Sequence, residues 1–160
     1  MLDQLDAGIP FAETVRDAQV KGLAESDPSA DLDGLDSARK LEILCRLAWG
    51  KAPDRLEVKG IRGLDPLNLA ATREQSRRCR LIATANADRA AVVAPMDVYE
   101  ADVLAQARGA ENRIEIRTTD GSIYQIAGLG AGRWRSSTAI LVDLIDAART
   151  QANCVVPGRR

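Results

Sequence analysis

The feature that most constrains this chain is a lysine–aspartate pair on the apolar side of a predicted helix. Residues 35–49 (LDSARKLEILCRLAW) have the spacing of apolar side chains that is typical of an amphipathic helix. At roughly 100° per residue, the broad apolar arc contains Leu41, Ile43, Leu44, Leu47 and Ala48. Asp36 and Lys40 fall inside this arc and stack on one face. Because a charge that faces a core is costly unless it is paired or functional, we expect both side chains to point inward as a working pair.

An acidic loop over residues 25–34 (ESDPSADLDG) runs directly into this helix. One interpretation is structural, in which Asp33 caps the helix and the other carboxylates favour its positive N-terminus. A calcium loop is excluded because Lys40 would stand at the last position, where an EF-hand needs a bidentate glutamate. Capping does not explain an inward lysine, so several carboxylates and one amine are predicted to converge near the helix start. The carboxylates are Glu25, Asp27, Asp31 and Asp33.

Composition narrows the classes of function. The chain has 160 residues, of which 22 are basic and 23 acidic, so its net charge of −1 provides no general basic surface for nucleic acid. The local cluster of Arg73, Arg77, Arg78 and Arg80 is interpreted as the solvated face and end of a helix. No apolar run approaches the about 18 residues that span a bilayer, and no signal peptide is recognised, so we expect no membrane partner.

Histidine and cysteine usage restricts the chemistry. The chain contains no histidine, so acid–base catalysis falls to Lys, Asp, Glu, Tyr or Cys. The three cysteines, Cys45, Cys79 and Cys154, match neither a CxxC metal site nor a disulfide framework. We therefore expect no metal site, and we expect the reducing cytoplasm as the location.

Hydrophobic periodicity and turn signals predict an α+β fold. Helices come first and antiparallel strands later, a pattern typical of helices packed on one face of a mainly antiparallel, mixed sheet. We expect one domain over residues 1–150 and a disordered tail over 151–160. The predicted helices are 1–6, 11–21, 35–49, 66–78 and 137–149, and the predicted strands are 56–61, 79–87, 90–97, 113–119 and 122–127.

A glycine-rich segment, 128–132 (GLGAG), joins the last predicted strand to the last helix. The dinucleotide fingerprint GxGxxG needs a further glycine where this chain has Arg133, and no parallel βαβ unit precedes the segment. A tight turn that uses positive φ is one interpretation. Contact between the backbone amides at the helix start and a phosphate held by another domain is the other.

Two segments together resemble the homoserine dehydrogenase family. Residues 25–44 are similar to the family pattern E-P-D-P-x-x-D-x-x-G-x-D-x-x-x-K, and segment 128–132 is similar to its closing G-P-G-A-G. The stretch 104–112 (LAQARGAEN) is similar as well, so the resemblance covers about residues 5–150. It implies an NAD(P)-dependent oxidoreductase that interconverts L-homoserine and L-aspartate 4-semialdehyde, on the route to threonine, methionine and isoleucine.

The resemblance also implies roles for individual residues. Lys40 would transfer the proton at the substrate oxygen, and Asp36 would orient Lys40 and the substrate. Glu25 and Asp31 would shape the pocket for the substrate ammonium. The backbone of Gly130, Ala131 and Gly132 would contact the cofactor.

The partners implied by the resemblance are NAD or NADP, a nucleotide-binding domain in cis or in trans, and a second copy of the chain. The family carries its nucleotide-binding half ahead of this region, and it forms a dimer through the sheet. Leu23 stands where a tyrosine often lines the substrate site, and Leu129 replaces the proline of G-P-G-A-G. A dehydrogenase acting on another polar aldehyde therefore stays open. So does a non-catalytic fragment or pseudoenzyme that serves as a dimerisation or small-amino-acid-binding module.

Overall fold

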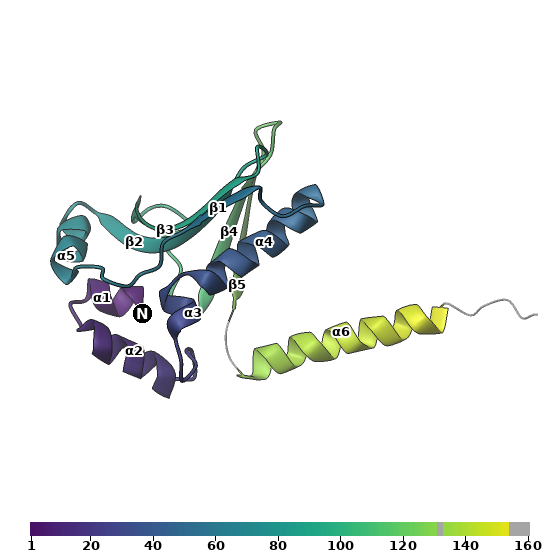
Figure 1. The fold of residues 1–160 in the computed structure, drawn as a ribbon, viewed down its shortest axis with the longest axis horizontal. Helices are drawn as coiled ribbons and strands as arrows, with labels where there is room; N and C mark the ends of the chain where they lie inside the picture. The colour runs from purple at the N-terminus through teal and green to yellow at the C-terminus, as the bar shows by residue number, and fades with distance from the viewer. Residues whose placement is uncertain (131–132, 154–160) are drawn as a thin grey trace, which may run out of the picture.

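The computed structural model describes residues 1–130 and 133–153, and it confirms the α+β fold class (Figure 1). Five helices and three strands of the first hundred residues form one body, and a hairpin and a long helix follow. The helices are α1 (Leu2–Asp6), α2 (Phe11–Val20), α3 (Ser29–Leu32), α4 (Leu35–Trp49), α5 (Pro66–Glu74) and α6 (Arg133–Asn153). The strands are β1 (Arg55–Val58), β2 (Arg77–Ala85), β3 (Ala90–Tyr99), β4 (Glu111–Arg117) and β5 (Ile123–Leu129).

The strands form two sheets. The first has the order β1-β3-β2, with β1 parallel and β2 antiparallel to β3, so the expected mixed sheet is confirmed. The second is the β4–β5 hairpin, in which Ile114 pairs with Ile126. Asp120 and Gly121 form its turn, where Gly121 has a φ of 86° that favours glycine. The hairpin was expected within one sheet, and it is instead a separate two-stranded unit.

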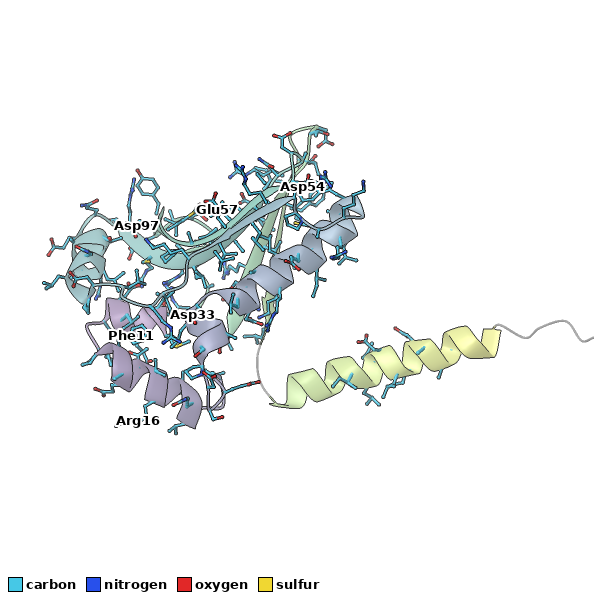
Figure 2. All side chains as sticks on the ribbon, viewed as in Figure 1. Phe11, Arg16, Asp33, Asp54, Glu57 and Asp97 are labelled. Atoms are coloured by element: carbon cyan, nitrogen blue, oxygen red, sulfur yellow. The ribbon has the colours of Figure 1, made fainter. Side chains whose placement is uncertain are left out.

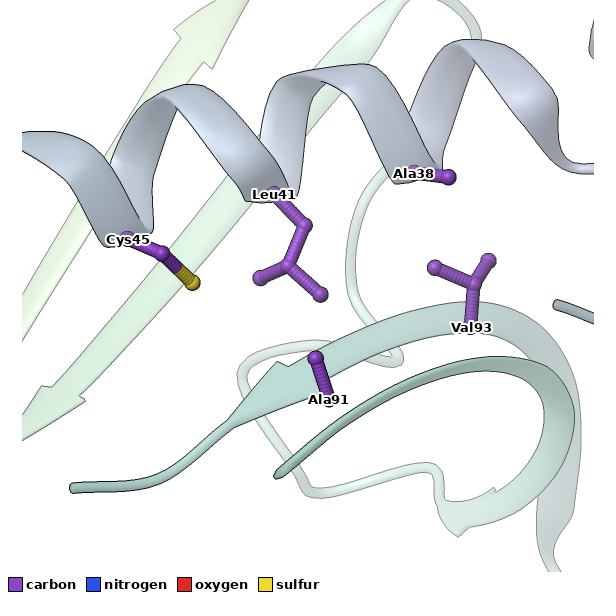
Figure 3. Packing of buried hydrophobic residues seen from close by; sticks show 5 residues of the cluster. All are labelled: Ala38, Leu41, Cys45, Ala91 and Val93. Atoms are coloured by element: carbon purple, nitrogen blue, oxygen red, sulfur yellow. The ribbon is translucent and has the colours of Figure 1, made fainter. Parts of the chain in front are cut away.

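The principal core lies between α4 and the three-stranded sheet (Figure 3). Ala38, Leu41 and Cys45 follow one another at helical spacing along α4, and they pack against Ala91 and Val93 of β3. The small side chains at both ends of this stripe let the helix lie close to the sheet. A smaller cluster of Leu5, Leu69 and Cys79 joins α1 and α5 to β2.

Only Arg73 of the arginine cluster lies at a helix end, in the last turn of α5, and the three other arginines do not, contrary to the sequence interpretation. Helix α5 ends at Glu74, and the following residues enter β2, where Arg80 is only 7% exposed. The Arg80 guanidinium lies 2.7 Å from Asp3 and 3.4 Å from Asp6, both on α1. It also donates to the carbonyl oxygen of Ala105 at 3.1 Å. Arg80 thus ties the first helix and a distant loop to the sheet, because a buried guanidinium needs acceptors on every side.

The C-terminal part extends away from this body (Figure 1). Helix α6 continues to Asn153, so it includes the first residues of the expected tail, and 154–160 lie outside the described residues. Its described apolar side chains are exposed, including Ile140 at 60% and Leu144 at 62%. None of the helices within 1–130 and 133–153 has the length and hydropathy to cross a membrane.

Candidate functional site

The candidate site lies where α3 meets the first turn of α4. Gly34 joins the two helices with a left-handed φ of 78°, a conformation that suits glycine and turns the chain sharply. A Cβ at Gly34 would lie 3.3 Å from Cγ1 of Val58, so strand β1 also restricts this position. Gly34, and not Asp33, occupies the N-cap position of α4, and no side chain caps that helix. The expected Asp33 cap is therefore wrong.

Lys40 and Asp36 form an ion pair on α4 with a separation of 2.6 Å. The expectation that both face the core is wrong, since their side chains are 55% and 41% exposed. The reason lies in the width of the apolar arc, of which the sheet covers only the Ala38–Leu41–Cys45 stripe. The rest of the arc stays open together with the ion pair. Its larger members are also exposed, with Ile43 at 58% and Leu47 at 79%.

The carboxylates of the acidic loop gather beside this ion pair. Burial is the main reason that the pKa of Asp31 lies above its ordinary value, and the neighbouring charge of Asp36 raises it further. Lys40 acts on Asp31 in the opposite direction, and Glu25 adds a smaller upward contribution. The charges of Glu25, Asp36 and Lys40 thus all act on Asp31, at a half-exposed surface.

Two side chains hold the acidic loop in place, one from α2 and one from the loop itself. Gln19 of α2 donates from Nε2 to the carbonyl oxygens of Glu25 and Ser26, both at 3.0 Å. Asp27 accepts the backbone N–H of Ser29 at 3.0 Å, and its hydrogen bonds to Ser29 lower the pKa of Asp27. The start of α3 is therefore fixed by contacts that do not involve the Lys40–Asp36 pair.

The sequence interpretation missed Arg62. The residue follows β1, and its guanidinium forms an ion pair with Asp33. Asp33 lies at the junction of α3 and α4 (Figure 2). It also donates to Oγ of Ser29 at 3.0 Å. No local pattern signals this contact, because Arg62 lies about thirty residues further along the chain and only the tertiary structure brings it to the loop.

The glycine-rich segment differs from its expected geometry. Neither Gly128 nor Gly130 has a positive φ, since Gly128 belongs to β5 and Gly130 follows that strand. A Cβ at Gly130 would lie 1.7 Å from Nδ2 of Asn112, so close packing against that amide explains this glycine. The two other predicted cofactor-contacting residues, Ala131 and Gly132, lie outside the described residues.

The described residues do not build a dinucleotide site by themselves. Among them, the glycine-rich segment follows an antiparallel hairpin and not a parallel βαβ unit. Over the same described ranges, no three His, Cys, Asp or Glu side chains are grouped so that they could hold a metal ion. What the site offers is a cluster of carboxylates and one amine beside an open apolar surface. Such a cluster can bind an ammonium group and exchange a proton with a neighbouring oxygen.

This arrangement defines an α+β domain with a carboxylate-rich helix junction, and comparison with known proteins identifies the family. The family model described as homoserine dehydrogenase matches residues 1–145. The chain therefore belongs to the homoserine dehydrogenase family.

The relatives of this chain are considerably longer than it is. The homoserine dehydrogenase of Sulfurisphaera tokodaii is 34% identical over 147 residues, which cover 91% of this chain and 45% of that protein. The NAD(+)-dependent homoserine dehydrogenase of Pseudomonas canavaninivorans is 33% identical over 151 residues, covering 91% of this chain and 43% of that protein. The chain thus spans less than half the length of either relative.

Solved structures share the fold. The homoserine dehydrogenase of Thiobacillus denitrificans matches 98% of this chain and 38% of its own, with a TM-score of 0.80 and 29% identity. A hyperthermophilic archaeal homoserine dehydrogenase mutant in complex with NADPH matches 99% of this chain and 45% of its own, with a TM-score of 0.75 and 25% identity.

Proposed function

We propose that this chain supplies the substrate site of an NAD(P)-dependent enzyme that interconverts L-homoserine and L-aspartate 4-semialdehyde. The observation that carries the proposal is that the charges of Glu25, Asp36 and Lys40 all act on Asp31 at one helix junction, where Asp36 is paired with Lys40. The membership of the chain in the homoserine dehydrogenase family supports it. Homoserine carries an ammonium group and a hydroxyl group, and the cluster has chemistry suited to both.

The acidic and the basic side chains have different roles in this proposal. Asp31 and Glu25 bind the substrate ammonium, for which carboxylates are the natural partners. Lys40 exchanges a proton with the hydroxyl oxygen of homoserine or the aldehyde oxygen of the semialdehyde, and the ion pair with Asp36 keeps its amine in place. NAD or NADP supplies the hydride chemistry when it is bound. A relative described as NAD(+)-dependent and a structure in complex with NADPH support a nicotinamide cofactor without deciding between the two.

The cofactor would be held mainly by a nucleotide-binding domain, in cis or in trans. Two observations support a further partner for this chain: its length, less than half that of the relatives, and the open apolar surface beside Lys40. The reaction is proposed for the cytoplasm, where the buried free thiols of Cys45 and Cys79 would stay reduced.

We also propose a homodimer formed through the strands. The β4–β5 hairpin exposes apolar side chains on both of its faces, which is unusual for a protein that acts as a single chain. These side chains include Ile116, Ile123, Tyr124, Ile126 and Leu129. Sedimentation equilibrium that returns only the mass of one chain at working concentration would oppose this assembly.

The experiment that tests the proposed function uses the chain joined to the nucleotide-binding half of the Sulfurisphaera tokodaii relative. NADPH oxidation is measured with aspartate semialdehyde, with Lys51→Ala as the control because Lys51 is an exposed lysine beyond the end of α4. Lys40→Ala should lower kcat by roughly 10²–10⁴-fold, the usual contribution of a general acid or base. Lys40→Arg can retain an ion pair with Asp36 but cannot exchange the proton, so it should be equally impaired. Wild-type rates in both Lys40 variants would remove the lysine from the mechanism.

A binding module is the second candidate, favoured because the glycine-rich segment follows an antiparallel hairpin and not the parallel βαβ unit of a dinucleotide fold. Calorimetry on the 160-residue chain separates the two, with L-homoserine and NADP as titrants. Homoserine binding without nucleotide binding favours the binding module, and neither signal favours a purely structural role; the kinetics of the joined protein then decide whether that module belongs to an enzyme. A panel of polar aldehydes on the joined protein tests whether Leu23, which is 41% exposed, changes the substrate.

A further inference from the structure

The one-turn helix α3 needs support from outside itself. It has four residues, and an isolated helix of that length is unstable in water. The conformational entropy lost in ordering the first turn outweighs the free energy that its one or two hydrogen bonds provide. Helix α3 nevertheless carries Asp31, a carboxylate of the proposed site whose pKa is raised mainly by burial. Some other part of the chain must therefore fix the position of Asp31.

The segment after β1 lies directly against α3 and provides this support. The backbone N–H of Ile61 donates to the carbonyl oxygen of Leu32 at 2.8 Å, and both residues are buried. A Cβ at Gly60 would lie only 2.1 Å from the same oxygen and 2.5 Å from Cα of Asp33. The two backbones are thus in contact along the end of α3.

Arg62 extends from this segment to both ends of α3. Its Nη2 donates to Oγ of Ser29, the first residue of the helix, at 3.0 Å. Its Nε pairs with Asp33, the C-cap residue, and Nη2 lies 3.4 Å from the second oxygen of that carboxylate. A planar guanidinium can make both contacts at once, whereas a lysine amine offers a single point charge.

We propose that Arg62 is a positioning residue that bridges the two ends of α3 and thereby holds Asp31 at the distance from Lys40 that substrate binding requires. The last part of this statement rests on the proposed function. Arg62 would act through the loop and would not touch the substrate, since its contacts are with Ser29 and Asp33. The Lys40–Asp36 pair lies within α4 and keeps its geometry when the loop moves.

The first measurement needs no substrate and follows the Asp31 carboxyl by carbon-detected NMR titration of the 160-residue chain. Burial and Asp36 raise the pKa of Asp31, so a loop that moves into solvent should let that pKa fall toward its ordinary value in Arg62→Ala. Simple loss of a positive charge would move the pKa in the opposite direction, upward. The sign of the change therefore separates displacement from electrostatics.

Arg78→Ala serves as the matched control because it also removes an ion pair, with Glu100 at 3.1 Å, but on strand β2. It should leave the Asp31 pKa unchanged. Arg62→Lys should lower the Asp31 pKa as well, by less than the alanine variant, and it carries the test if Arg62→Ala fails to fold. An Asp31 pKa that stays constant or rises in Arg62→Ala, or that keeps its wild-type value in Arg62→Lys, overturns the proposal.

The second measurement is steady-state kinetics of the joined protein described above. Arg62→Ala should raise KM for L-homoserine about tenfold, the change expected when one charged contact to the ammonium is lost, with kcat changed far less. A fall in kcat at constant KM would overturn the positioning role. If the unmodified protein shows no activity or binding with homoserine, the proposed function fails, while the Asp31 titration still decides whether Arg62 positions the loop.

Discussion

Gly60 offers a sharp test of the contact between α3 and the segment after β1. Replacing Gly60 by alanine adds one methyl group at a position where Cβ would lie 2.1 Å from the Leu32 carbonyl oxygen. Ordinary contacts of this kind begin at 3.4 Å, so one of the two backbones must move by more than 1 Å. Neither neighbour is a flexible side chain that could move aside cheaply.

The cost of this movement has two parts. Forcing extra volume into a packed site costs about 1–3 kcal/mol. The shift also breaks the hydrogen bond from Ile61 to Leu32, now 2.8 Å, which contributes about 1 kcal/mol. Gly60→Ala should therefore lower the free energy of unfolding by about 2–4 kcal/mol, measured by urea denaturation with circular dichroism.

Gly128→Ala is the matched control. Like Gly60, Gly128 has no positive φ, but nothing lies within 4 Å of its added Cβ. The control should change the free energy of unfolding by less than about 0.5 kcal/mol. Equal stability of the two variants would refute the close approach of the backbones, and with it the structural basis for support of α3.

Three further perturbations test the core, the buried arginine and the acidic loop. Leu41→Ala should lower the free energy of unfolding by about 2–4 kcal/mol in urea denaturation, because Leu41 is only 7% exposed between α4 and β3. A smaller loss of stability would contradict the packing of α4 on the sheet. Arg80→Met should cost about 3–5 kcal/mol in the same assay at pH 7, since it leaves Asp6 buried without its cation. Asp31→Asn should be more stable than wild type at pH 7, because burial and Asp36 raise the folded-state pKa of Asp31 and its ionisation therefore opposes folding. That advantage should vanish well below pH 3.8, the ordinary pKa of the carboxyl, because the group is then neutral in both states. A variant less stable than wild type at pH 7 would contradict the environment assigned to Asp31.

Local signals in the sequence were sufficient for most of the secondary structure. Helix α4 begins and ends where predicted, at Leu35 and Trp49, because periodic apolar residues precede a glycine that adopts the left-handed conformation. The turn that contains Asp120 and Gly121 was equally local, since a short hairpin loop, here three residues between Thr118 and Ser122, places a glycine at positive φ. The start of β2 was missed because a strand is stabilised by its partner β3, and Arg77 and Arg78 carry no signal for that pairing in their own neighbourhood.

The composition of the candidate site was also readable from the sequence. Glu25, Asp31, Asp36 and Lys40 are close along the chain, and one loop and one helix are enough to gather them. The solvent exposure of these four side chains could not be predicted from the sequence, because α4 has more apolar surface than the sheet covers. Helical periodicity shows which residues share a face, and it does not show which part of a wide apolar face meets the core.

The chain alone therefore determined the helix, the acidic loop and the family, because each was recognised from short continuous segments of sequence. Only the tertiary structure decided that Lys40 faces outward, that Arg80 is buried beside α1, and that Arg62 reaches the ends of α3. The physical reason is common to the three cases. Burial and ion pairing depend on contacts between residues that are distant in sequence. The packing of the helices on the sheet determines these contacts, and no local pattern of residues does.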